Sequence, residues 1–208
     1  MSKPRGTSRS WKERQQRDPY VQQARRDGWR SRAVYKLEQI DQKERLLRPG
    51  MVVVDLGAAP GSWSQYVTEK LKGRARILAI DLLAMDSLPA VEFLQADFAA
   101  DDTPKTLRTM LGDEAVDLVM SDMAPNITGN RAIDQPRAMY LVELALEFCR
   151  LVLRPGGAFV CKLFQGEGSD AFIADVKASF ERVKVMKPKA SRPGSREVYL
   201  VARNYQLV

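Results

Sequence analysis

Residues 52–67 read VVVDLGAAPGSWSQYV, an apolar run followed by an aspartate, a turn bounded by Gly57 and Gly61, and a stretch of helical character. This order is typical of a strand–turn–helix ligand site at the edge of an α/β sheet. The turn has Ala59 where a dinucleotide fingerprint has its middle glycine, and Ser62-Trp63 follows where a P-loop has lysine. The stretch therefore favours a nucleoside ligand that has no pyrophosphate.

Strand-like and helix-like segments alternate along the rest of the chain. We expect strands at 51–54, 76–80, 91–96, 116–121 and 157–162, and near 181–186 and 197–203. We expect helices at 31–47, 62–71, 103–111 and 134–153, and near 169–180, with Ser31 and Ser62 as the N-caps of the first two. This alternation predicts an α/β fold with a doubly wound, mostly parallel sheet.

Positive charge is concentrated at the N-terminus. The formal net charge is +7, and residues 1–32 contain ten Lys or Arg against three acidic residues, which leaves the remainder neutral. We expect a basic arm at 1–30 and a single domain at 31–208. A basic arm on a neutral domain favours a polyanionic partner such as RNA, with a solubilising tail as the alternative.

Composition excludes several chemistries. The sequence contains no histidine, so any proton transfer must use Lys, Asp, Glu, Tyr or Cys. Cys149 and Cys161 lie in apolar surroundings without metal-ligand spacing, which indicates reduced core residues. No stretch reaches membrane-spanning length, and the first residues have no signal-peptide character. We expect a cytoplasmic protein with no metal ion and no membrane anchor.

Five apolar runs each end in an ionisable residue: Asp55, Asp81, Asp97, Asp122 and Lys162. The carboxyl ends of parallel strands border the ligand crevice of such a sheet. Asp81 is placed to accept from a ribose diol, Asp97 from an exocyclic amine, and Asp122 suits a nearby sulfonium cation. Together these residues point to S-adenosylmethionine.

Five motifs carry a resemblance to a known family. They are DLGAAPGSWSQY (55–66), SDMAPN (121–126), PRAMYLVELALE (136–147), KLFQGEG (162–168) and SREVYLVA (195–202). The chain resembles the FtsJ/RrmJ family of RNA ribose 2′-O-methyltransferases from about residue 20 to about residue 203. The nearest likeness is to bacterial members that methylate a uridine ribose of 23S (large-subunit) ribosomal RNA. The resemblance implies a Rossmann-like class I fold that binds S-adenosylmethionine.

The resemblance also implies the site residues. A Lys-Asp-Lys-Glu catalytic tetrad matches Lys36, Asp122, Lys162 and Glu197. Cofactor contacts are implied for Gly61, Trp63, Asp81, Asp97 and Asp122. Ser62 stands where the family usually has a second glycine before the tryptophan, which adds a side chain but removes no catalytic group. From the residues alone, a solvated helix lysine is the favoured interpretation of Lys36, and an exposed strand residue that of Glu197. Trp63 is as often a core anchor as a cofactor contact.

The resulting hypothesis is methyl transfer from S-adenosylmethionine to the ribose 2′-hydroxyl of a uridine, by in-line displacement. Lys162 is expected to act as the base or to orient the hydroxyl group. The expected partner is ribosomal RNA within the assembled large subunit, bound by a monomeric enzyme. A methyltransferase for transfer RNA or the messenger cap would use the same tetrad. A non-enzymatic RNA-binding assembly factor and a nicotinamide-dependent oxidoreductase are the alternatives from other classes.

Overall fold

The computed structural model of the chain describes residues 17–207. In that part of the chain, seven strands form one sheet in the order β3-β2-β1-β4-β5-β7-β6. β7 runs antiparallel to its neighbours β5 and β6, and the other neighbouring pairs are parallel. The strands are β1 Met51–Leu56, β2 Ala75–Asp81, β3 Val91–Gln95, β4 Val116–Ser121, β5 Leu153–Phe164, β6 Phe180–Met186 and β7 Glu197–Tyr205. The predicted α/β, mostly parallel architecture is confirmed.

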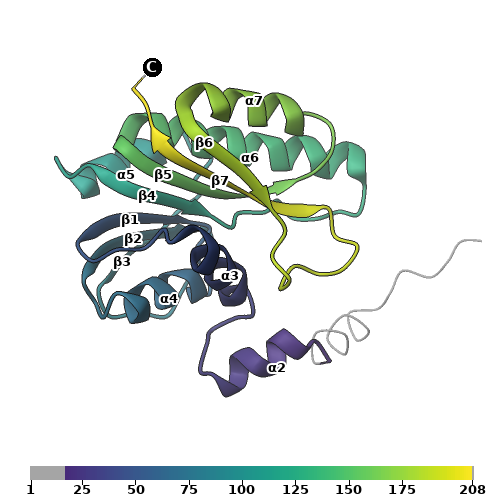
Figure 1. Cartoon of the computed structure of the whole chain (residues 1–208), viewed down its shortest axis with the longest axis horizontal. Helices are drawn as coiled ribbons and strands as arrows, with labels where there is room; N and C mark the ends of the chain where they lie inside the picture. The colour runs from purple at the N-terminus through teal and green to yellow at the C-terminus, as the bar shows by residue number, and fades with distance from the viewer. Residues whose placement is uncertain (1–16, 208) are drawn as a thin grey trace, which may run out of the picture.

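Helices cover both faces of this sheet (Figure 1). They are α2 Pro19–Arg26, α3 Val34–Glu44, α4 Ser62–Lys70, α5 Thr103–Leu111, α6 Arg131–Val152 and α7 Ser169–Ser179. Side chains of α3 and α4 pack with Val53 on one face, and side chains of α5, α6 and α7 pack with Val54 on the other. Because successive strand residues face opposite sides, β1 is buried on both faces, and this explains its continuous apolar run.

The order of the strands in the sheet determines where a ligand crevice lies. From β1 the chain proceeds to β2 and β3 on one side, and from β4 it proceeds to β5 on the other. The reversal lies between β1 and β4, and the loops that follow these strands therefore open a crevice at the carboxyl edge.

Two predicted helix caps are wrong. α3 begins at Val34 with Ala33 as its N-cap, and Ser31 instead accepts from the Ala33 amide and donates to the Ser62 hydroxyl at 2.8 Å. α4 has Gly61 as its N-cap, with φ of 103°, and Ser62 is its first helical residue. A left-handed backbone at this reversal suits glycine, so the cap falls one residue earlier than the serine.

Part of the predicted arm is helical. α2 lies within residues 1–30, its N-cap Asp18 accepts from the Tyr20 amide, and Pro19 occupies its first position. Its Tyr20 ring lies 5.5 Å from the Tyr35 ring of α3, so this helix rests against the domain. Residues 1–16 of the predicted arm lie outside the described residues.

Two smaller expectations concern burial and membranes. Cys149 and Cys161 are buried and free, as predicted. No helix within residues 17–207 has the length and apolar character needed to cross a membrane.

Candidate active site

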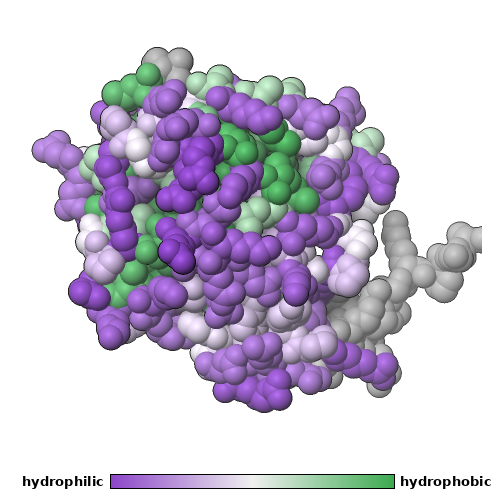
Figure 2. All heavy atoms as spheres, in the orientation of Figure 1, coloured by the Kyte–Doolittle hydropathy of each residue, from purple (hydrophilic) through white to green (hydrophobic). Residues whose placement is uncertain are grey.

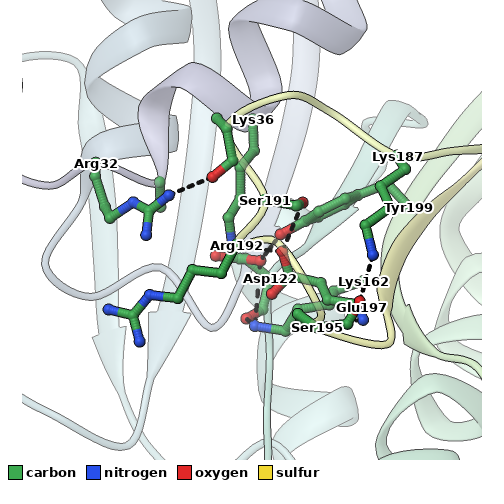
Figure 3. Close-up of polar contacts among 12 residues, drawn as sticks. Arg32, Lys36, Asp122, Lys162, Lys187, Ser191, Arg192, Ser195, Glu197 and Tyr199 are labelled. Atoms are coloured by element: carbon green, nitrogen blue, oxygen red, sulfur yellow. Dashed lines mark hydrogen bonds and ion pairs between the residues drawn. The ribbon is translucent and has the colours of Figure 1, made fainter. Parts of the chain in front are cut away.

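Two ion pairs from four separate segments meet at the crevice. Lys36 Nζ of α3 lies 2.8 Å from Glu197 Oε1 at the start of β7. Lys162 Nζ of β5 lies 3.2 Å from the Oδ1 of Asp122, the residue after β4, and donates to the Asp122 carbonyl at 2.6 Å. Figure 3 shows these side chains pointing toward one another. The structure therefore brings all four predicted tetrad residues together.

Tyr199 links the two ion pairs. Its hydroxyl donates to Asp122 Oδ1 at 2.6 Å, and its ring lies 5.6 Å from Lys36 Nζ. It stands directly opposite Lys162 in the β5–β7 register. The sequence analysis missed this residue, although Tyr199 follows Glu197 by two positions and alternate residues of a strand share a face.

The tetrad is largely shielded from solvent. The side chains of Lys36 and Glu197 are 13% and 12% exposed, and those of Lys162 and Asp122 are 9% and 18% exposed. These values do not fit a solvated helix lysine or an exposed strand carboxylate. Charges at this depth are retained when they are paired and hydrogen-bonded, as they are here.

The surroundings set the ionisation of Asp122. Burial alone would raise the pKa of this carboxyl, but Lys162, Lys36 and the Tyr199 hydroxyl together hold the pKa below its ordinary value. Tyr199 responds in the opposite sense, since burial and the adjacent carboxylates raise the pKa of its hydroxyl. The site thus keeps Asp122 as a carboxylate and Tyr199 as a neutral hydrogen-bond donor.

A cavity of about 350 Å³ lies beside the tetrad, formed by the loops after β1, β2, β3 and β4. It is lined by Asp81, Asp97 and Asp122, and no lysine or arginine among residues 17–207 lines it. Three carboxylates in such a lining oppose a phosphate ligand and suit a cationic nucleoside. Asp122 belongs both to this cavity and to the tetrad.

Close packing shapes the turn after β1. Gly57 has φ of 77°, and a Cβ atom there would lie 2.6 Å from Met123 Cγ in the loop after β4. Asp81 holds the same turn from β2, because its Oδ2 accepts from the Ala59 amide at 2.9 Å and its Oδ1 from the Leu83 amide at 2.8 Å. The cavity therefore has fixed walls, and a side chain at Gly57 would disturb them.

Gly61 and Trp63 do not line this cavity. A Cβ at Gly61 would lie 2.7 Å from Met85 Sδ and 2.9 Å from Arg30 Nη1. Trp63 is 2% exposed, and its indole donates to the Ala33 carbonyl at 2.8 Å. Trp63 is thus a core anchor in this structure, and cofactor contacts from both residues stay predictions.

Asp55 is a further buried acid near the crevice. Its Oδ2 accepts from the Ser64 hydroxyl at 2.7 Å, and its Oδ1 has no hydrogen-bond partner among residues 17–207. Burial raises the pKa of this carboxyl to about 7. Asp55 lines a small cavity of about 30 Å³ together with Trp63 and Asp122. An unpaired carboxyl oxygen here can accept from an ammonium group, such as that of a methionine moiety.

Comparison with known proteins identifies the class. Residues 29–205 match the family model of FtsJ-like methyltransferases. A solved Plasmodium falciparum protein, designated a ribosomal RNA methyltransferase, is 30% identical, with a TM-score of 0.77 over 85% of this chain and 98% of that one. A Streptococcus mutans methyltransferase bound to S-adenosylhomocysteine shares the fold at 11% identity, with a TM-score of 0.52 over 79% of this chain and 96% of that one.

The fold and the acid-lined crevice are those of a methyltransferase of the doubly wound α/β type. The chain belongs to the FtsJ-like methyltransferase family. Family membership confirms S-adenosylmethionine as the cofactor, and the three carboxylates that line the cavity fit it.

Proposed function

We propose that this protein transfers a methyl group from S-adenosylmethionine to the ribose 2′-hydroxyl of a uridine in large-subunit ribosomal RNA. The observation that carries the proposal is that Asp122 belongs both to the cofactor cavity and to the tetrad. Asp122 lines the cavity, and its carboxylate is ion-paired to Lys162 at 3.2 Å. An acceptor oxygen held by Lys162 would therefore lie beside the bound cofactor.

Lys162 is suited to hold that oxygen. An ammonium group has three N–H donors, and Asp122 accepts two of them through its carbonyl and its carboxylate. The third remains for the 2′-oxygen of the acceptor ribose. These are the contacts of a charged donor, so we assign Lys162 to orienting the hydroxyl group for in-line attack rather than to acting as the base.

Asp122 is the proposed proton acceptor. S-adenosylmethionine supplies an electrophilic methyl group on its sulfonium. The 2′-hydroxyl becomes strongly acidic as its oxygen takes on a new bond to carbon, so a carboxylate suffices to remove the proton. Asp122 Oδ1 lies 3.2 Å from Lys162 Nζ, so this carboxylate adjoins the oxygen that Lys162 would hold.

Lys36 and Glu197 are proposed to position the other two residues. Glu197 accepts from the Ser191 hydroxyl at 2.9 Å and pairs with Lys36. Lys36 in turn lies beside the Tyr199 ring, whose hydroxyl orients Asp122. The Lys36–Glu197 ion pair thereby positions Tyr199, and the Tyr199 hydroxyl in turn holds Asp122, the proposed proton acceptor.

Basic side chains around the crevice support an RNA substrate. The segment 187–196 contains Lys187, Lys189, Arg192 and Arg196 directly before Glu197. Arg192 is 55% exposed, and α2 adds Arg25 and Arg26 in its last turn. Hydrophilic side chains cover most of the face viewed in Figure 2, α2 included. Lysine and arginine side chains at such positions bind a phosphate backbone without reading its sequence. The name of the Plasmodium relative favours ribosomal RNA over transfer RNA or a messenger cap.

The test uses large subunits purified from cells that lack this protein. They are incubated with the full chain and S-adenosylmethionine, and ribose methylation is then mapped along the RNA. We expect one new 2′-O-methyluridine, formed in subunits and not formed without the cofactor. Methylation of a base nitrogen or carbon, or of transfer RNA alone, would refute the proposal. The monomeric state and the cytoplasmic location stay predictions.

A further inference from the structure

A second cavity, of about 230 Å³, lies next to the tetrad. It is lined by Ile127, Asp134, Gln135, Phe164, Ser195 and Arg196. Phe164 follows Lys162 by two residues on β5 and stands opposite Glu197 in the β5–β7 register. Two strand residues span about 7 Å, so this cavity begins roughly 7 Å from the Lys162 position.

The walls of this cavity are held by a connected set of hydrogen bonds. Gln135 is 6% exposed, and its Nε2 donates to the Phe164 carbonyl at 3.1 Å and the Glu167 carbonyl at 3.0 Å. Arg196 Nη1 donates to Gln135 Oε1 at 3.3 Å and to the Gln165 carbonyl at 3.0 Å. The cavity is therefore a fixed, polar one rather than a gap between loose side chains.

Gly166 allows this arrangement. Its φ is 157°, and a Cβ there would lie 2.9 Å from Gln135 Cδ and 3.0 Å from Arg196 Nη1. A side chain at this position would push both walls apart, so the glycine of the KLFQGEG motif keeps the cavity in shape.

Arg196 and Ser195 offer unused hydrogen-bond donors to this cavity. Arg196 Nη2 and Nε have no partner within the described part of the chain, and the Ser195 hydroxyl accepts from the Glu197 amide while its own hydrogen stays free. Asp134 is largely occupied, because its oxygens accept three hydrogen bonds from Thr128 and Gly129. Phe164 supplies an apolar wall. A flat ring with carbonyl acceptors matches this combination.

We propose that this cavity, here called the base pocket, receives the nucleobase of the nucleotide whose ribose is methylated. Arg196 and Ser195 donate to the carbonyl oxygens of uracil, and Phe164 packs against the ring. Uracil carries two carbonyls, whereas cytosine replaces one with an amine, which cannot accept from Arg196. The proposal rests on the proposed function, because it needs a ribose held at Lys162.

The test compares large subunits reconstituted with RNA that carries uridine, cytidine or an abasic ribose at the methylated position. All three keep the 2′-hydroxyl. For the wild-type chain we expect kcat/KM to fall by about tenfold to a hundredfold from uridine to either replacement. For Arg196→Ala we expect a similar loss on uridine and no further loss on the abasic acceptor.

Arg192→Ala is the matched control, because Arg192 is exposed and precedes Arg196 by four residues. It should lower kcat/KM by the same factor on uridine and abasic acceptors, as expected for a phosphate contact. If Arg196→Ala binds S-adenosylmethionine differently from wild type, Ser195→Ala replaces it under the same criterion. If Arg196→Ala, or Ser195→Ala in its place, lost kcat/KM by the same factor on uridine and abasic acceptors, the base pocket would be overturned. Absence of ribose methylation by the wild-type chain would instead overturn the proposed function.

Discussion

Tyr199 and Lys162 share one acceptor: the tyrosine hydroxyl donates to Asp122 Oδ1 at 2.6 Å, and the lysine ammonium lies 3.2 Å from the same oxygen. The two residues face each other across β5 and β7, so the register of the sheet fixes their spacing. Two donors on one oxygen restrain the carboxylate in a single orientation. Asp122 is thereby aligned between the cofactor cavity and the proposed acceptor site.

Tyr199→Phe removes one of these donors and keeps the ring. A hydrogen bond to a charged group contributes about 1.5–3 kcal/mol, so we expect kcat to fall roughly tenfold to a hundredfold. The pKa of Asp122 should rise, since the Tyr199 hydroxyl helps to lower it. The acid limb of the pH–rate profile should then move to higher pH. Tyr205→Phe is the control, because Tyr205 is also buried in β7 but donates to the Arg150 carbonyl. An unshifted acid limb for Tyr199→Phe would contradict this role.

The Lys36–Glu197 pair should show the coupling of a shielded ion pair. Lys36→Met leaves Glu197 without its counter-charge and should cost on the order of 2–4 kcal/mol of the free energy of unfolding in urea. The double variant with Glu197→Gln should recover most of that loss but not the activity. Lys105→Met, which breaks the exposed Lys105–Asp102 pair, should change little. Additive losses in the double variant would show that the pair is not coupled.

Gly57→Ala should weaken S-adenosylmethionine binding at least tenfold by calorimetry, because the new Cβ would meet Met123 Cγ at 2.6 Å. Gly73→Ala provides a matched control, since Gly73 has φ of 70° and no neighbouring atom within 4 Å of its Cβ position. Both variants should lose about 1–2 kcal/mol of stability from the left-handed backbone. Only Gly57→Ala should lose cofactor affinity. Equal affinities for the two variants would remove Gly57 from the cavity wall.

The raised pKa of Asp55 predicts that the free energy of unfolding depends on pH. Burial raises the pKa of its carboxyl from 3.8 to about 7, so the folded state retains a proton that the unfolded state releases. The stabilisation of the folded state by this proton is fully present below about pH 4. It declines by roughly 1.4 kcal/mol per pH unit as the pH rises and is lost above about pH 7. Asp55→Asn keeps an oxygen for Ser64 and removes the titration. The stability of Asp55→Asn relative to wild type should therefore rise from pH 4 to 7 and then level off. A constant difference would show that Asp55 does not titrate in this range.

The strand-end acids were predictable from the sequence, because parallel strands deliver their carboxyl ends to one edge. Asp81, Asp97 and Asp122 each follow an apolar run, and all three line one cavity. Local patterning likewise placed the strands and most helices, since buried strands require continuous apolar runs.

The rest of the site depends on topology that local patterns do not encode. Glu197 lies at the start of a strand, and it reaches the crevice because β7 runs antiparallel to β5. Lys36 comes from α3, whose position is set by packing of its apolar side chains on the sheet. Tyr199 belongs to the site through cross-strand pairing with Lys162. The resemblance supplied Lys36 and Glu197 where the residues alone favoured solvated positions.

The central claim is that Lys162 holds the reacting ribose oxygen beside the cofactor. The most direct measurement is single-turnover methyl transfer to the large subunit by Lys162→Ala, with S-adenosylmethionine binding measured on the same preparation. Lys184→Ala serves as the control, because Lys184 lies on β6, on the far side of β7, and pairs with Glu44. We predict a loss of at least about a hundredfold in the rate for Lys162→Ala, with cofactor binding retained. Transfer by Lys162→Ala at a rate near that of Lys184→Ala would contradict the account.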